Sequence, residues 1–154
     1  MQRSGMPDGS VAIDGSRPPL VIVRFSDVVA SDEDLLTLLA TIESRHERGE
    51  PFVLIVDCRT LIAPMTAAQR GLVGIADGAM SSPETRARTR MADVLVTTNP
   101  LVRSALVVVQ WGANTVVPKL AVATAKEAIP FLEERCARFG VELGDDAREW
   151  LEAH

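Results

Sequence analysis

The apolar residues of this chain recur with two different periods, which predict strands and helices in alternation. Two short segments at 10–13 and 20–25 are rich in β-branched residues, and a turn with Asp-Gly and Pro-Pro separates them. The run at 52–56 is apolar at every position, which is typical of a strand that helices cover on both faces. Two more strands are predicted at 92–98 and 119–124.

The first predicted helix follows the second strand and has signals at both of its ends. Ser31 is a good N-cap residue, and Asp34 lies three positions later, as in a weak form of the capping box. Gly49 is suited to end the helix. Between these ends, four residues form an apolar stripe at helical spacing: Leu35, Leu38, Leu39 and Ile42. We place His46 on the exposed side of this helix.

Two later helices also have recognisable starts. Thr66 and Gln69 have the T-x-x-Q spacing of a capping box. Asn99 before Pro100 is an N-cap followed by proline at the first helical position, which predicts a helix over 100–112. The β-branched residues of that stretch leave a strand as the competing interpretation.

The order of elements, β-β-α-β-α-β-α-β-α-α, predicts an α/β fold. We expect a single layered domain with a mostly parallel sheet of four to five strands and an antiparallel first strand pair. Pro130 should bend the helix after the last strand, and Asp145 or Asp146 should cap a short terminal helix. The expected parts are a disordered tail at 1–9, the domain at 10–140 and a C-terminal extension helix at 141–154.

Composition and charge narrow the classes of function. Aromatic residues make up 4% of the 154 residues and there is no Tyr, so the core must consist of Val, Leu, Ile and Ala. A net charge of −5 argues against sequence-independent binding of nucleic acid or an anionic membrane. No apolar run approaches the roughly 20 residues of a membrane span. Two cysteines provide no disulfide framework, so we expect a cytoplasmic protein.

Four stretches carry a resemblance to a known family: PPLVIVRFSDVVASDEDLLTLL, GEPFVLIVDCRTLIAPMTAAQR, NPLVRSAL and AVATAKEAIPFL. Over about residues 10–139, the chain resembles the STAS-domain fold, and within it the SpoIIAA-like branch of small stand-alone bacterial proteins. The resemblance implies a non-enzymatic regulatory module similar to anti-sigma-factor antagonists. In those proteins a strand that ends in Asp leads to an Asp-Ser-Gly turn, where a kinase phosphorylates a serine. This chain keeps Asp57, but APMTAAQ replaces the turn, and Thr66 is the only hydroxyl there.

Three residues near the end of the 52–56 strand are candidates for chemistry. Asp57 is either a general base or phosphate acceptor, or an anchor for the loop, which we prefer. Cys58 is either a nucleophile close to a helix N-terminus or, as we expect, an inert buried thiol. Thr66 either accepts phosphate or caps its helix, and its spacing to Gln69 favours the cap. We therefore expect no catalytic residue, metal or cofactor, since no nucleotide, metal or hydrolase motif is present.

A basic stretch precedes the fourth strand. Pro83 is well placed to open a helical turn, and Arg86, Arg88 and Arg90 follow it. These arginines either bind an anionic group or acidic partner, or belong to a solvated connection. We prefer the solvated connection, because charge runs are usually exposed.

The helix predicted over 100–112 carries more apolar residues than one buried face accommodates. The surplus predicts either a homodimer interface or a groove for an apolar small molecule, and Trp111 is either part of it or a core residue. The residues concerned are Leu101, Val102, Leu106, Val109 and Trp111. The sequence thus favours a regulatory or protein-interaction module with an unidentified protein partner. The alternative is a small protein that binds an apolar ligand or lipid.

Overall fold

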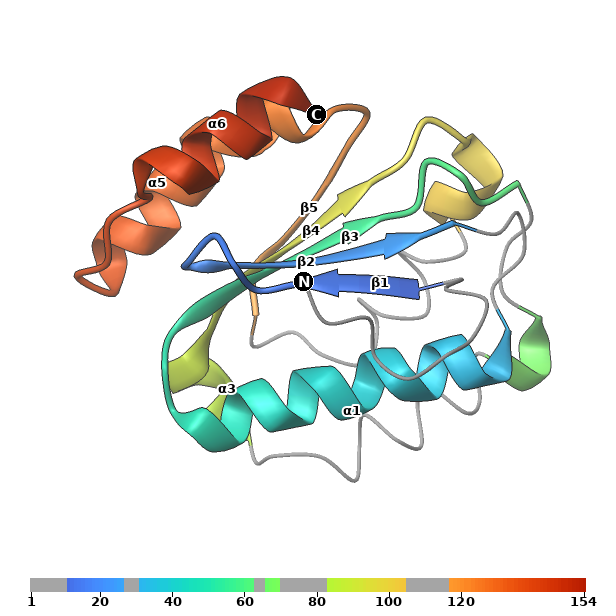
Figure 1. Cartoon of the computed structure of the whole chain (residues 1–154), viewed down its shortest axis with the longest axis horizontal. Coiled ribbons are helices and arrows are strands. Elements are labelled where there is room, and N and C mark those ends of the chain that lie inside the picture. Colours follow the sequence, from blue (N-terminus) through green and yellow to red (C-terminus); the bar gives the residue numbers. More distant parts are fainter. Residues whose placement is uncertain (1–10, 27–30, 63–65, 70–82, 105–116) are drawn as a thin grey trace.

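A five-stranded mixed sheet forms the centre of the protein (Figure 1). A computed structural model describes residues 11–26, 31–62, 66–69, 83–104 and 117–154. The strands lie side by side in their chain order; β1 is antiparallel to β2, and the others are parallel. They are β1 (Val11–Asp14), β2 (Leu20–Phe25), β3 (Phe52–Asp57), β4 (Arg90–Val96) and β5 (Lys119–Val122). The predicted α/β class and the antiparallel first pair are confirmed.

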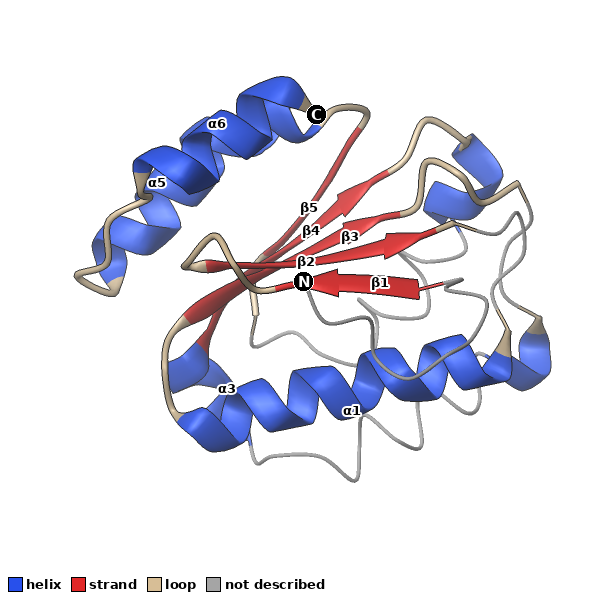
Figure 2. Ribbon diagram, in the orientation of Figure 1, coloured by secondary structure: helices blue, strands red, loops and turns tan. Residues whose placement is uncertain are grey.

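Helices cover both faces of the sheet (Figure 2). One face carries α1 (Asp32–Arg48) and α3 (Pro83–Thr89). Because neighbouring strands follow each other in sequence and crossovers are right-handed, helices that connect parallel strands belong on one face. The other face is covered by the elements after β5: η1 (Ala125–Ala128), α5 (Ile129–Arg138) and α6 (Asp145–Ala153).

The alternation of side chains along each strand divides the apolar interior into two cores. Val21, Val23, Leu54 and Val56 pack with α1, whereas Leu20, Ile22, Val53 and Ile55 pack with η1, α5 and α6. Every residue of β3 is buried, as the sequence predicts for a strand between two helical layers. Within the described ranges, no helix combines the length and the apolarity that a membrane crossing requires.

Both predicted ends of α1 are confirmed. The Ser31 hydroxyl accepts a hydrogen bond from the Asp34 amide at 3.1 Å, and the Asp34 carboxylate accepts one from the Ser31 amide at 3.3 Å. Gly49 takes the left-handed conformation with φ 73°, which a residue without Cβ adopts easily.

The boundaries of β4 and β5 differ from the prediction. β4 begins at Arg90, which pairs with Phe52, and ends at Val96 instead of residue 98. β5 ends at Val122 because the Glu127 carboxylate takes the next main-chain amide, that of Ala123, at 3.1 Å.

The C-terminal helices also differ in detail from the prediction. The helix after β5 is broken, as Pro130 predicts: η1 ends at Ala128 and Pro130 lies in the first turn of α5. The predicted cap of the last helix is wrong, because Gly144 occupies the N-cap and both Asp145 and Asp146 lie inside the first turn.

The predicted exposure of His46 is wrong, because its side chain is 3% exposed. Position 46 lies one turn beyond Ile42 and continues the apolar stripe of α1 toward α3. The ring packs edge-on against Phe52, and Nδ1 lies 2.6 Å from the Thr89 hydroxyl oxygen. That hydroxyl donates to the main-chain oxygen of Thr85, so it accepts the hydrogen bond from Nδ1. In the neutral ring Nε2 is then an acceptor, and among the described residues it is the one buried side-chain nitrogen or oxygen without a partner.

We predict that His46 makes the protein less stable in mild acid. Burial lowers the pKa of His46 from its ordinary 6.5, and the nearby Arg90 lowers it further. Below about pH 6.5 the unfolded chain therefore binds more protons at this position than the folded protein does. The free energy of unfolding thus decreases as the pH is lowered. Urea unfolding across this range should show the fall.

The matched variant is His46→Asn, which keeps an N–H group for Thr89 but does not titrate. Its stability should depend less steeply on pH between about 7.5 and 5.5 than that of the natural chain. Equal slopes in the two proteins would contradict the role of His46.

Candidate functional site

Asp57 is the last residue of β3, at the carboxyl edge of the parallel strands. It lies opposite Arg24 of β2 in the sheet register, and both side chains are on the face covered by α5 and α6. Among the five described strands the order never reverses, so this edge lacks the switch point where open α/β sheets form their ligand crevice.

The Asp57 carboxylate accepts hydrogen bonds from two arginine side chains and one main-chain amide. Arg59 donates from Nε to Oδ1 at 3.0 Å and from Nη2 to Oδ2 at 2.8 Å. Its main-chain amide also reaches Oδ1, at 3.1 Å, and Arg24 donates to Oδ2 at 3.3 Å. A carboxylate that holds the amide two residues ahead of it fixes the loop, so the interpretation of Asp57 as a loop anchor is confirmed.

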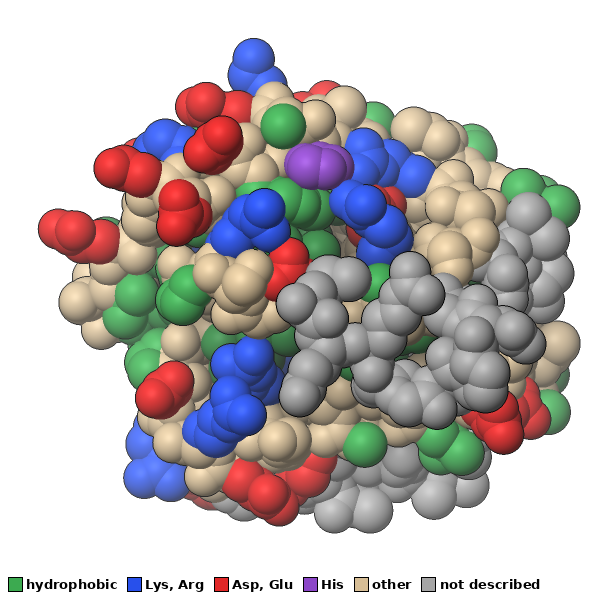
Figure 3. Space-filling view, in the orientation of Figure 1, with side chains coloured by type: hydrophobic (Ala, Val, Ile, Leu, Met, Phe, Trp, Pro, Cys, Tyr) green, Lys and Arg blue, Asp and Glu red, His purple; other side chains and the backbone are tan. Residues whose placement is uncertain are grey.

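The same network reaches the end of α6. Arg59 Nη1 donates to the main-chain oxygen of His154 at 2.6 Å, and the His154 ring stacks on Trp150 with centroids 4.3 Å apart. Figure 3 shows basic side chains gathered beside a surface histidine below the end of α6. The network therefore joins the ends of β2 and β3 to the last helix.

The electrostatics of Asp57 do not suit a general base. Burial by itself would raise the pKa of this carboxyl, but the hydrogen bonds and charge of Arg59 and the charge of Arg24 outweigh burial and lower the pKa. The carboxylate is therefore a weak proton acceptor at neutral pH.

Cys58 points to the opposite side of the sheet and packs in the core beneath α1. It is 1% exposed, and burial together with the neighbouring charge of Asp57 raises the pKa of its thiol. The thiol is therefore protonated at neutral pH and shielded from solvent, which is the inert state predicted from the sequence.

Thr66 caps the helical turn at 67–69. Its hydroxyl accepts a hydrogen bond from the Gln69 amide at 3.1 Å, and the Gln69 side-chain oxygen accepts one from the Thr66 amide at 3.0 Å. The predicted capping box is confirmed. The Gln69 side chain also donates to Asp32 at 3.1 Å and so joins this turn to the start of α1.

The three candidates for chemistry thus point in different directions and do not converge on one cavity. Asp57 faces α6, Cys58 faces α1, and the exposed Thr66 caps a helical turn. In the described part of the chain, no group of three His, Cys, Asp or Glu residues has the arrangement of a metal site.

The interface predicted on the helix over 100–112 lies only partly within the described residues. Asn99 caps it as expected, since its side-chain oxygen accepts from the Leu101 amide at 2.9 Å. Val102 is buried in the core beneath α1, and Leu101 is 67% exposed. The other members lie outside the described residues, namely Leu106, Val109 and Trp111. The homodimer and the apolar groove therefore stay predictions.

The predicted solvated connection at Arg86, Arg88 and Arg90 is wrong for two of the three arginines. Arg86 and Arg90 are buried, and only Arg88 is exposed. Positions 83–89 form helix α3, whose buried residues Arg86 and Thr89 lie three positions apart on one helix face, and Arg90 is the first residue of the buried strand β4.

Sequence reasoning also missed a buried ion cluster at the amino edge of the sheet. Arg90 Nε donates to Asp93 Oδ1 at 2.5 Å and Nη2 to Oδ2 at 2.7 Å, and Lys119 lies 2.6 Å from the same Oδ2. The sequence indicated this cluster only through Asp93, a charged residue that interrupts an apolar strand three positions after Arg90. No sequence feature indicated the part of Lys119, because its proximity to Asp93 depends on the pairing of β4 with β5.

Comparison of the chain with protein-family models, curated proteins and solved structures found no match.

Asp57→Asn should destabilise the protein by roughly 1–3 kcal/mol, because two arginines lose a charged acceptor in a partly exposed setting. Urea unfolding measures the loss, and hydrogen exchange should show faster opening of the last turn of α6. Glu134→Gln is the control, since its ion pair with Arg138 is exposed and should contribute at most about 0.5 kcal/mol. Equal losses in the two variants would contradict the anchoring role.

Cys58 should react slowly with a thiol reagent while the protein is folded. A Cys136→Ala variant leaves Cys58 as the single thiol, and its modification should be fast only after unfolding in urea. Rapid modification of the folded variant at neutral pH would show that the thiol is accessible and would restore the nucleophile hypothesis.

Proposed function

We propose that this protein is a non-enzymatic protein-interaction module with a regulatory role, and that a partner protein docks at the carboxyl edge of its sheet. The observation that carries the proposal is the placement of exposed apolar side chains. The three large hydrophobic residues that are exposed in the described part of the chain are Leu36 (48%), Ile62 (63%) and Leu101 (67%).

These three residues belong to segments that leave the same edge. Leu36 is in the first turns of α1, which follows β2; Ile62 is in the loop after β3; and Leu101 opens the helix after β4. In Figure 1 the arrowheads of the parallel strands and the start of α1 lie at the same end of the molecule. Isolated exposed apolar residues are common on proteins, whereas several at one edge are typical of an interaction surface.

Asn99 holds two of the three segments together. Its side-chain oxygen accepts from the Leu101 amide, and its side-chain nitrogen donates to the Ile62 main-chain oxygen at 3.3 Å. Ile62 and Leu101 are therefore presented by loops of fixed relative position, which lowers the entropy cost of docking.

The surroundings of this edge define the kind of partner. Arg24 and Arg59 keep 45% and 30% of their side chains exposed beside Asp57, and Arg103, two residues after Leu101, is also exposed. A complementary partner surface presents apolar side chains with acidic groups around them.

The resemblance to anti-sigma-factor antagonists supports the same class of function. The proposal does not require phosphorylation of Thr66, because helix capping already accounts for that residue. An enzyme that uses Asp57 and Cys58 is disfavoured by the ion-paired carboxylate and the buried thiol. The alternative, a carrier of an apolar ligand, depends on residues outside the described part.

The proposal is tested by purifying the natural chain and variants of the carboxyl edge, and comparing the proteins that remain bound to each. The natural chain, purified from its own cells under mild conditions, should retain a stoichiometric protein partner. The double variant Ile62→Asp with Leu101→Asp should lose it, and the reconstituted complex should bind at least about tenfold more weakly, since each buried apolar contact is replaced by a desolvated charge.

The matched control is Ala137→Asp, which adds one charge to an exposed position of α5 on the other side of the sheet. It should retain the partner. A natural chain that purifies alone and monomeric by light scattering, or a double variant that binds as well as the natural chain, would contradict the proposal.

A further inference from the structure

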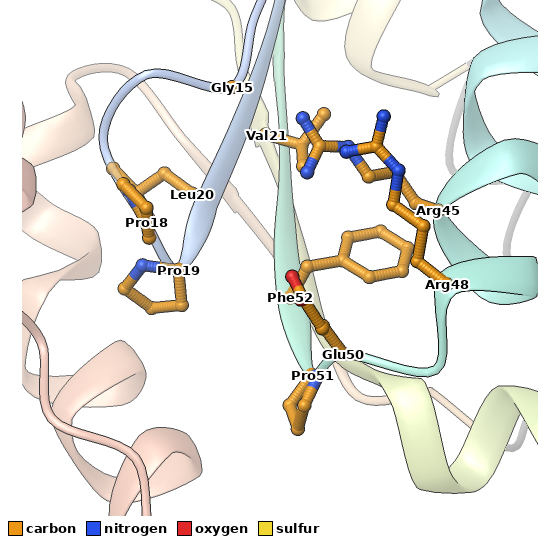
Figure 4. A pocket seen from close by; sticks show the side chains of 10 residues that line it. All are labelled: Gly15, Pro18, Pro19, Leu20, Val21, Arg45, Arg48, Glu50, Pro51 and Phe52. Atoms are coloured by element: carbon orange, nitrogen blue, oxygen red, sulfur yellow. The ribbon is translucent and has the colours of Figure 1, made fainter.

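Two arginines at the opposite edge of the sheet point the same way into a hollow. Arg45 and Arg48 lie three residues apart near the end of α1, so their side chains leave the same side of the helix. Figure 4 shows both guanidinium groups side by side, extending past the ring of Phe52 toward Val21 and the turn that carries Gly15.

The hollow lies between the β1–β2 turn and the end of α1, at the amino ends of β2 and β3. Its empty volume is about 360 Å³, including the part open to solvent. Phe52 and Val21 are buried and form an apolar floor, and Pro18 and Pro19 of the turn form one wall.

Neither guanidinium group has a hydrogen-bond acceptor or an ion-pair partner among the described residues. Other arginines of the sheet and its edges do have carboxylate partners: Arg24 and Arg59 at Asp57, and Arg90 at Asp93. Each guanidinium carries five N–H donors in a planar fork, so the pair directs an unusual number of unused donors into one hollow.

The β1–β2 turn is shaped around one of these groups. A Cβ added at Gly15 would clash with the guanidinium of Arg45, because the two groups would lie closer than van der Waals contact allows. The absence of a side chain at Gly15 therefore gives Arg45 access to this position. Burial lowers the pKa of Arg45, and the like charge of Arg48 lowers it further, so the two cations are held together at an electrostatic cost.

We infer that Arg45 and Arg48 form a binding site for a phosphoryl group, either inorganic phosphate or the terminal phosphate of a monoester. A tetrahedral phosphate dianion presents more acceptor oxygens and one more negative charge than a carboxylate, so it is better suited to two guanidinium forks that converge on one hollow. Its charge also offsets the repulsion between the two arginines, and the open side of the hollow leaves room for an attached organic group.

Glu50 also lines the hollow and limits the affinity of the site. Its negative charge attracts Arg45 and raises the pKa of that group, and it repels an incoming anion. The site thus carries two positive charges and one negative charge, from which we expect millimolar affinity for inorganic phosphate and tighter binding when the Glu50 charge is removed.

The experiment is an NMR titration of the backbone amides at constant ionic strength and about pH 7.5, where a phosphomonoester is largely dianionic. One arm uses inorganic phosphate and the other uses glycerol 3-phosphate. Saturable shifts of the Gly15, Val21 and Phe52 amides are expected. Tighter binding of glycerol 3-phosphate than of inorganic phosphate would identify a monoester as the preferred ligand. Equal binding would show that the site recognises the phosphoryl group alone, as free phosphate presents it.

Four variants separate charge from geometry. Arg45→Gln and Arg48→Gln should each weaken binding about tenfold, since each removes one charged fork. Gly15→Ala keeps every charge but displaces the Arg45 guanidinium, so it should also weaken binding. Glu50→Gln should strengthen binding about threefold, as expected from the loss of one partly screened repulsion.

Arg138→Gln on α5 is the control, because Arg138 forms an exposed ion pair with Glu134 and neither residue lines the hollow, so this variant should bind as the natural chain does. The absence of a saturable shift at these amides up to about 50 mM phosphate would overturn the inference. So would unchanged binding in both arginine variants, since the shifts would then report general ionic effects. Neither result bears on the partner surface at the other edge of the sheet.

Discussion

Burial of β3 and β4 along their whole length is the constraint on which the rest of the structure depends. A strand buried on both faces needs a helical layer on each side, and α1 with α3 and α5 with α6 supply the two layers. A charged side chain in such a strand must also find a partner, because an unpaired buried charge costs several kcal/mol. Asp57 and Asp93, the two acids of these strands, each hold two cationic side chains.

The two acids have different effects because Asp93 lies in the middle of β4, whereas Asp57 is the last residue of β3. Asp93 joins the start of β4 to β5 inside the protein, where its partners Arg90 and Lys119 are almost fully buried. Asp57 ends β3 and, through Arg59, fixes both the following loop and His154, the residue that follows α6. At the carboxyl edge, where we propose that a partner docks, this ion network and the hydrogen bonds of Asn99 hold the loops in place.

The amino and carboxyl edges also differ in what they leave unsatisfied. At the carboxyl edge Arg24 and Arg59 are paired with Asp57, and three large apolar side chains are exposed: Leu36, Ile62 and Leu101. At the amino edge Val21 and Phe52 are buried, and the guanidinium groups of Arg45 and Arg48 lack partners within the described chain. The first kind of surface suits a protein partner, and the second suits a small anion.

The sequence alone determined the fold class, the order of the strands and three of the helix starts, because these depend on local spacing. The caps at Ser31, Thr66 and Asn99 involve atoms within three residues of one another, so their geometry follows from the chain itself. Only the tertiary structure decided which charges are buried and with what partners. Arg24 meets Asp57, and Lys119 meets Asp93, through the register of neighbouring strands, and the burial of His46 depends on the docking of α3 against α1. Such contacts join residues 26 to 43 positions apart, and no local periodicity encodes them.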